Sequence, residues 1–197
     1  MVGLIDSADK TMTQWFKQDG DVILLLGKTK EDLGGSEYLK VHHHREQGSP
    51  PFLSLAAEKI LHDFILKVIH EGSVQSAHDC SDGGLSIALA ECCISAPDTR
   101  RGAVVKLTLD TLRLDALLFG ESQSRVVLSV KPEMMDRVLN SAWDSGVPAT
   151  KIGIVGGDRF VIDVEEGQWS EGCHIDFPIG QLYDRWAFSI ERTLNQA

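Results

Sequence analysis

Strand-like and helix-like segments alternate along this chain, and this alternation restricts its fold more than any other feature. The run from Val22 to Gly27 (VILLLG) is short, apolar and rich in branched side chains, which favours a buried strand. From Phe52 to Ile69 the apolar residues recur every three or four positions, which predicts a long amphipathic helix ended by Gly72. A short strand over residues 74–78 and a helix over residues 85–96 are expected next.

The second half of the chain repeats the alternation. Residues 104–109 and 125–130 predict strands, and residues 132–146 predict a helix with its proline in the first turn. The segments on either side of Gly156 and Gly157 are typical of a hairpin or of paired strands. The pattern as a whole predicts an α/β (α+β) fold, layered, with one mixed β-sheet covered by helices.

The length of the chain limits the number of domains. A chain of 197 residues suffices for one well-filled domain. We therefore expect a single domain over residues 21–197, preceded by an N-terminal arm or lead-in segment over residues 1–20. Within the domain, residues 33–51 are rich in glycine, proline and polar side chains and are expected to form loop and linker.

Composition and charge narrow the range of partners. The chain is 43% hydrophobic and 24% charged, as expected of a packed domain, and its formal net charge is −10. Such a charge repels phosphate backbones and anionic lipids, so neither nucleic acid nor a membrane is an expected partner. The start of the chain lacks the pattern of a signal peptide, which favours a cytoplasmic location. An anionic ligand would need a helix N-terminus, a basic side chain or a divalent cation.

The cysteines and the histidine run indicate no metal or redox centre. The four cysteines (Cys80, Cys92, Cys93 and Cys173) show no paired CxxC spacing, and we expect all of them to be reduced. Residues 42–44 are three consecutive histidines. Consecutive side chains point in different directions on a helix or strand, so they are not expected to converge on one ion.

The sequence HDCSDGG, residues 78–84, gathers two carboxylates, a hydroxyl and two glycines between an expected strand and an expected helix. Glycines permit turns that aim successive N–H groups at an anion, and the following helix adds its positive end. Asp79 or Asp82 could supply the oxygen ligands that Mg²⁺ prefers. A purely structural alternative is an N-cap followed by an ordinary turn, and the spacing leaves both open.

A second polar motif, FGESQSR, occupies residues 119–125 and runs directly into an expected strand. The entrance to a strand can present a carboxylate, a carboxamide and an arginine toward a phosphate or sugar. Alternatively, Glu121 and Arg125 form a solvated turn pair that contributes little. The pattern alone favours the solvated pair.

A third motif, GGSE at residues 34–37, is either an ordinary turn with a helix cap or a nest that faces a substrate. The sequence contains no GxSxG, P-loop, HExxH or GxGxxG motif. No catalytic nucleophile is therefore predicted.

Taken in order, the segments LGGSEYL, AHDCSDGGLSIALAE and LFGESQSRVVLSV resemble the C-terminal domain of the aminoimidazole ribonucleotide synthetase superfamily. The resemblance is closest to the small form of phosphoribosylformylglycinamidine synthase and extends from Val2 to about Arg192. It implies a ligase of purine biosynthesis that uses ATP and Mg²⁺ to activate the formamide oxygen of formylglycinamide ribonucleotide as an iminophosphate. Ammonia then displaces the phosphate to give the amidine.

The resemblance also implies roles for individual residues. Asp79 and Ser81 match positions that face Mg²⁺ and the nucleotide phosphates, and Gly120 and Glu121 match a second nucleotide and metal contact. The implied nucleotide-binding set is Asp79, Ser81, Gly83, Gly84 and Gly120; the implied metal ligands are Asp79 and Glu121; the implied substrate contacts are Gln123 and Ser124. No residue of this chain is implied to be catalytic.

The remaining expectations concern what the chain lacks. Enzymes of this family carry N-terminal synthetase domains with the catalytic histidine, an acidic metal cluster and most of the ATP cleft, and they work with a glutaminase subunit and a small accessory subunit. The chain is therefore expected to be inactive alone, as a piece of a longer enzyme or as one product of a split gene. A homodimer is a further expectation. Alternatives are another enzyme of the superfamily, such as aminoimidazole ribonucleotide synthetase, or a non-catalytic scaffold module.

Overall fold

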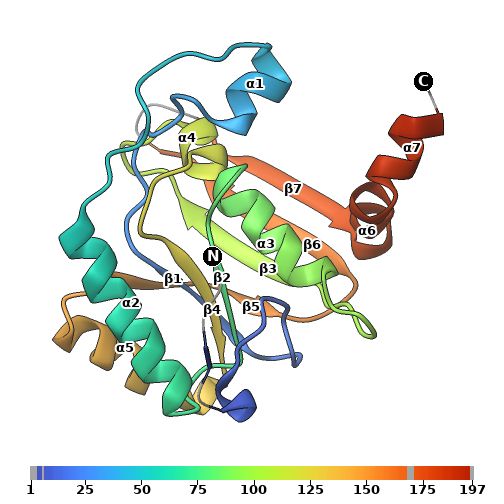
Figure 1. The fold of residues 1–197 in the computed structure, drawn as a ribbon. Helices are drawn as coiled ribbons and strands as arrows, with labels where there is room; N and C mark the ends of the chain where they lie inside the picture. Colours follow the sequence, from blue (N-terminus) through green and yellow to red (C-terminus); the bar gives the residue numbers. More distant parts are fainter. Residues whose placement is uncertain (1–3, 6, 168–170, 196–197) are drawn as a thin grey trace.

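The protein is built on one mixed β-sheet (Figure 1). This computed structural model describes residues 4–5, 7–167 and 171–195. The sheet has seven strands in the order β2-β4-β1-β5-β3-β6-β7. Strands β3 and β6 are parallel, and the other neighbouring strands are antiparallel. The strands are β1 (Val22–Leu26), β2 (Ser76–Asp79), β3 (Ala103–Thr108), β4 (Val126–Val130), β5 (Ala149–Val155), β6 (Arg159–Glu165) and β7 (Cys173–Pro178).

Helices connect and cover these strands. They are η1 (Ala8–Lys10), α1 (Glu37–His43), α2 (Leu55–His70), α3 (Gly84–Ile94), α4 (Leu114–Phe119), η2 (Pro132–Met134), α5 (Met135–Asp144), α6 (Ile179–Ala187) and α7 (Ser189–Asn195). Within the described residues, no helix is long and apolar enough to cross a membrane.

Strand β1 is buried on both faces, and it divides the interior into two cores. Ile23 and Leu25 belong to a core shared with α3, α4 and α6. Leu24 and Leu26 belong to a second core shared with α2 and α5. Figure 1 shows α2 and α5 beside β1, β2 and β4, with α3 beside β3 and β6. Because both faces of β1 are covered, its sequence is a continuous apolar run, as the sequence analysis predicted.

The predicted pairing around Gly156 and Gly157 is wrong. Strands β5 and β6 do flank these glycines, but they do not pair with one another, because β3 lies between them. Ala103 is opposite Val155 on one side and Phe160 on the other. The loop is held over the start of β3, since the Gly102 N–H donates to the Gly157 carbonyl (2.7 Å) and the Gly156 N–H donates to the Gly102 carbonyl (2.8 Å). A local turn signal could not reveal a strand inserted from 50 residues earlier in the chain.

The expected loop over residues 33–51 contains a helix that the sequence analysis missed. Helix α1 begins after Ser36, whose hydroxyl accepts a hydrogen bond from the Leu39 N–H (3.3 Å). The alternative of a turn with a helix cap at the GGSE motif is therefore confirmed. The sequence analysis also assigned no element to the residues of α4, β7, α6 and α7.

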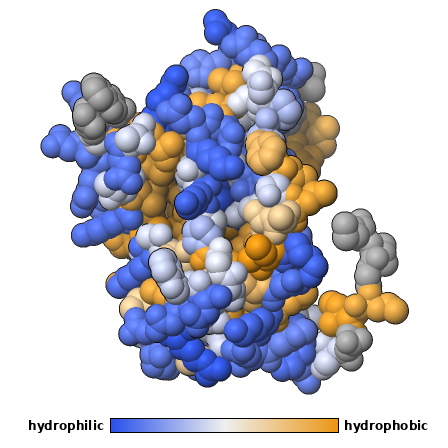
Figure 2. Space-filling model, turned by 90° about the vertical axis from the view of Figure 1, so that its left-hand side faces the viewer, coloured by the Kyte–Doolittle hydropathy of each residue, from blue (hydrophilic) through white to orange (hydrophobic). Residues whose placement is uncertain are grey.

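Apolar side chains also reach the surface. Figure 2 views the molecule from the side of α2 and α5 and shows hydrophobic areas interspersed among hydrophilic ones. On α2, the apolar side chains of Leu55, Ile60 and Leu66 are exposed. The helix thus has apolar residues on more than its buried stripe.

We predict that Gly84→Ala destabilises the fold far more than Gly72→Ala. Both glycines have a positive φ (69° and 65°), but a Cβ at Gly84 would lie 2.5 Å from the Gly120 carbonyl oxygen, whereas Gly72 faces open space. Strain alone costs about 1 kcal/mol, and strain with a backbone clash costs about 3 kcal/mol or more. Urea unfolding of both variants measures the difference; equal losses would contradict the close approach of the turn to α4.

Candidate functional site

The HDCSDGG turn joins β2 to α3 and lines a polar pocket of about 290 Å³. The other walls come from α2 and from the segment that leads into β4. Four carboxylates line this pocket, which we call the carboxylate pocket: Glu58, Asp79, Asp82 and Glu121. The HDCSDGG and FGESQSR motifs, residues 78–84 and 119–125, therefore meet at one site although 34 residues separate them in the sequence.

Asp79 belongs to a chain of hydrogen bonds that begins on α3. Glu91 bonds His78 Nε2 (2.8 Å), His78 Nδ1 lies 3.6 Å from the Asp79 carboxylate, and the Ser81 hydroxyl donates to that carboxylate. The contacts from His78 and Ser81 hold the pKa of Asp79 well below its usual range. Burial opposes protonation of His78, but its bonds to Asp79 and Glu91 outweigh this effect and raise its pKa. Asp79 is thus an ionised, oriented carboxylate at the pocket wall.

The glycines of the two motifs have their amides engaged within the protein. The N–H groups of Gly83, Gly84 and Gly120 donate to Glu121, Ser81 and Ala116, respectively. Helix α3 has Gly83 as its N-cap, without a side-chain cap, so the expected Asp or Ser cap is absent. These glycines allow close packing instead: a Cβ at Gly84 or Gly120 would lie within 2.5 Å of a carbonyl oxygen.

Glu121 connects three segments of the site. Its Oε1 accepts hydrogen bonds from the Gly83 N–H before α3 and from the Glu37 N–H at the start of α1, both 2.9 Å long. Its own N–H donates to the Asp32 carbonyl (2.9 Å). One carboxylate oxygen is therefore committed to the backbone, and Oε2 is the oxygen that remains for a ligand.

The sequence pattern favoured a solvated turn pair of Glu121 and Arg125. This prediction is wrong, because Arg125 is buried. Only 2% of its surface is exposed, which makes it the largest fully buried side chain of the described chain. Its guanidinium donates to the carbonyls of Ser122 (3.0 Å) and Gly120 (2.5 Å) and to Thr29 Oγ1 (3.2 Å). Burial lowers its pKa. The guanidinium of Arg125 therefore holds the segments that form the site in place, and its donors bond protein oxygens rather than a ligand.

Gln123 and Ser124 also line the carboxylate pocket. Gln123 is exposed, and Ser124 adopts a positive φ of 61°. The Ser124 hydroxyl donates to Glu58 Oε1 (2.6 Å), which ties the motif to α2. Glu58 and Glu91 were not singled out from the sequence, because each is one acidic residue within a helical pattern and nothing local marks it.

The donor set suits a cation shared with a phosphate better than a cation held by the protein alone. In the part of the chain that the structure describes, no three His, Cys, Asp or Glu side chains are grouped to hold a metal ion. Mg²⁺ is usually held by one or two carboxylates together with substrate phosphates. Asp79 and the free oxygen of Glu121 fit that mode.

The four cysteines are free thiols. Burial raises the pKa of Cys80 to about 11 and raises the pKa values of Cys92 and Cys93 well above their ordinary value. Buried thiols of this kind are inert packing residues, which is consistent with the expected reduced state.

The sequence, the fold and the paired motifs define a known class of domain. Residues 18–165 match the family described as AIR synthase related protein, C-terminal domain. The chain belongs to this family, and the predicted fold class is confirmed.

Two curated relatives of this chain carry the same name. Phosphoribosylformylglycinamidine synthase subunit PurL of Caldanaerobacter subterraneus subsp. tengcongensis is 44% identical over 192 residues, which covers 97% of this chain and 25% of the relative. The subunit of the same name from Moorella thermoacetica is 45% identical over 164 residues, which covers 83% of this chain and 22% of the relative. The chain thus spans about a quarter of the length of the curated relatives that it matches.

Solved structures share the fold. Thermotoga maritima PurL complexed with FGAR superposes with a TM-score of 0.72 at 23% identity, over 89% of this chain and 30% of that chain. T. maritima PurL complexed with ATP gives 0.66 at 21% identity, over 89% and 28%. The structure of PurLQS from T. maritima gives 0.63 at 21% identity, over the same shares. At this level of identity the likeness establishes the fold.

We predict that Arg125→Met destabilises the protein by about 3 kcal/mol, because it leaves buried carbonyls without their donors. Arg137→Met is the matched control: Arg137 is exposed, pairs with Glu71 at 3.3 Å, and should cost less than about 1 kcal/mol. Thermal and urea unfolding give both values. Similar losses in the two variants would mean that Arg125 is not the tie between these segments.

We predict that His78 titrates above its ordinary pKa and that Glu91→Gln lowers this pKa, since it removes a charged hydrogen-bond partner. A raised folded-state pKa means that protonation of His78 stabilises the fold. This contribution is complete below the unfolded-state pKa and is lost as the pH rises through the folded-state pKa. NMR titration of the imidazole resonances measures both proteins; an unchanged pKa in Glu91→Gln would contradict the contact.

Proposed function

We propose that this chain is the C-terminal domain of a phosphoribosylformylglycinamidine synthase. In the whole enzyme, ATP would phosphorylate the formamide oxygen of formylglycinamide ribonucleotide, and ammonia would displace phosphate to leave the amidine, with ADP and phosphate released. The observation that carries the proposal is the 44% identity, over 97% of this chain, to a relative of that name. The proposal favours this reaction over that of aminoimidazole ribonucleotide synthetase and over a non-catalytic scaffold.

The carboxylate pocket is the proposed nucleotide site. Asp79 is ionised and held in place by His78 and Ser81, so it offers a fixed anion to a metal-bound nucleotide. The amides of Ser81 and Asp82 precede the positive end of α3 and suit phosphate oxygens, whereas the amides of Gly83, Gly84 and Gly120 are already bonded. We propose that these three glycines serve the nucleotide by allowing the backbone to approach it closely.

Asp79 and Glu121 are the proposed ligands of Mg²⁺. When bound, Mg²⁺ would neutralise phosphate charge next to the carboxylates. Without such a cation, the four carboxylates of the pocket would repel a nucleotide. Gln123 and Ser124 line the pocket and are the proposed substrate contacts.

The rest of the enzyme is part of the proposal. We infer that residues 21–197 form the domain and that residues 1–20 lead into it from the preceding synthetase domains. Those domains would supply the catalytic histidine and most of the ATP cleft, and a glutaminase subunit and a small accessory subunit would complete the assembly. The neighbour structure described as PurLQS supports such an assembly. We further propose a cytoplasmic location, in keeping with this biosynthetic role.

We predict that calorimetric titration of the chain with Mg²⁺ and ATP shows saturable binding that Asp79→Asn weakens about tenfold or more, because a charged ligand to the metal is lost. Asp98→Asn alters an exposed carboxylate outside the pocket and should leave binding unchanged. Failure of the unaltered chain to bind would overturn the assignment of a nucleotide site to this chain alone.

Glu121→Gln tests the second ligand without disturbing the backbone. Glutamine keeps an oxygen that can accept from Gly83 and Glu37, so stability should be retained. The loss of charge should weaken the Mg²⁺-dependent part of ATP binding. Unchanged binding in a stable Glu121→Gln variant would assign Glu121 a structural role only.

We predict that the chain alone does not turn over formylglycinamide ribonucleotide with ATP and ammonia, because no catalytic residue is assigned to it. A coupled assay for ADP release measures this. Substrate-dependent turnover by the purified chain would contradict the proposal that other domains supply the catalytic machinery.

A further inference from the structure

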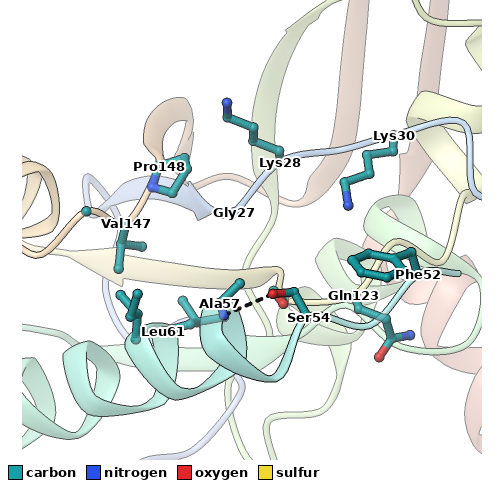
Figure 3. Close-up of a pocket in the computed structure, with 13 residues that line it drawn as sticks. Gly27, Lys28, Lys30, Phe52, Ser54, Ala57, Leu61, Gln123, Val147 and Pro148 are labelled. Carbon is teal, nitrogen blue, oxygen red and sulfur yellow. Dashed lines mark hydrogen bonds between the residues drawn. The ribbon is translucent and has the colours of Figure 1, made fainter.

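A second pocket, of about 250 Å³, adjoins the carboxylate pocket but differs from it in chemistry (Figure 3). It lies where β1 ends, between the start of α2 and the loop after α5. Gln123 and Ser124 line both pockets. The charged residues that line the second pocket are Lys28 and Lys30, and no carboxylate lines it. The chain has a formal net charge of −10, so a pocket whose charged lining residues are both cations differs from the rest of the molecule in its local charge.

Lys30 is the cation aimed into this pocket. In Figure 3 its ammonium extends toward Phe52 and the beginning of α2, whereas Lys28 extends away from the helix. The Lys30 Nζ lies 5.8 Å from the centre of the Phe52 ring. Neither lysine takes part in the ion pairs found in the described chain, so the charge of Lys30 is not neutralised by a neighbouring carboxylate.

The backbone that carries Lys30 is fixed from the interior. The Lys30 N–H donates to the hydroxyl of Ser122, which is fully buried, and Thr29 Oγ1 accepts from Arg125. Gly27 donates to the Pro148 carbonyl (2.8 Å) and approaches Ser124 so closely that a Cβ would lie 2.0 Å from its carbonyl oxygen. The pocket wall is therefore rigid before any ligand arrives, which lowers the entropy lost on binding.

The remainder of the pocket is apolar. Phe52, Ile60, Leu61, Val147 and Pro148 form its walls around the first turns of α2. Ser54 and Ala57, at the N-terminus of this 16-residue helix, also line the pocket, although the Ala57 N–H is already bonded to the Ser54 hydroxyl (3.3 Å). A flat apolar body can pack against these walls while an anionic group meets Lys30.

We propose that this pocket binds a phosphate monoester of a ring-bearing small molecule, with the phosphate against Lys30 and the ring against Phe52 and the apolar walls. The ligand is distinct from the metal-bound nucleotide of the carboxylate pocket and needs no divalent cation. The inference does not depend on the proposed function, because it would hold even if the carboxylate pocket bound nothing.

Phenyl phosphate is a minimal probe that has both parts of this ligand. We would titrate it into the ¹⁵N-labelled chain in the presence of EDTA and follow the amide resonances, with inorganic phosphate and phenol as single-part probes. We expect saturable shifts around Lys30, the first turn of α2 and Gln123, and tighter binding of phenyl phosphate than of either part.

Three lysine variants give the decisive comparison. Lys30→Gln should weaken phenyl phosphate about tenfold, the effect of one charged hydrogen bond. Lys28→Gln should weaken it less than about threefold, since that side chain points away. Lys151→Gln, at an exposed lysine on β5, should have no effect.

Several results would overturn the proposal. They are shifts that do not saturate, equal effects of Lys30→Gln and Lys151→Gln, and binding of inorganic phosphate as tight as that of phenyl phosphate, which would indicate an adventitious anion only. Because the probe needs no Mg²⁺, failure here is separate from failure of the ATP titration.

Discussion

The guanidinium of Arg125 holds together the segments from which both pockets are built. It bonds the backbone of the FGESQSR motif at Gly120 and Ser122, and it reaches Thr29 in the segment that follows β1. Arg125 itself precedes β4, so the central strands of the sheet fix its position. A buried charge is stable here because its donors meet polar oxygens. The segments that form the pocket walls are therefore held to the central sheet through the hydrogen bonds of Arg125.

On this frame, the protein separates its charges into two neighbouring compartments. The carboxylate pocket contains Asp79 and Glu121, whereas the neighbouring pocket contains Lys30. The hydrogen bond from Ser124 to Glu58 lies at their boundary and draws the acidic side chain of α2 to one side. Because the two pockets have opposite potentials, the domain can accept a cation in one and an anion in the other. The carboxylates and the lysine do not neutralise one another, since they line separate pockets.

Local sequence patterns predicted strands β1 to β6 and helices α2, α3 and α5, but they missed α1, α4, β7, α6 and α7 and could not predict how the strands pair. The apolar run of β1 and the periodicity of α2 identified these elements, because burial on two faces or on one stripe leaves a local trace. The position of β3 between β5 and β6 depends on contacts 50 residues apart, which no local pattern contains. The motif around Asp79 was identified from its residue types and from its position between an expected strand and an expected helix. The burial of Arg125 and the hydrogen bond from Glu91 to His78 depend on tertiary packing, so the sequence did not reveal them.

The insertion of β3 has a consequence for how the chain folds. Strands β5 and β6 are separated by only three residues, and a direct hairpin between them would be the fastest contact for this segment to form. That hairpin would close the gap that β3 must occupy, so it would have to open before the native sheet could form. The glycine pair at Gly156 and Gly157, clamped to Gly102, keeps the two strands apart and leaves a slot for the earlier strand. In the native sheet, β3 takes the pairing edges that β5 and β6 would otherwise offer to each other.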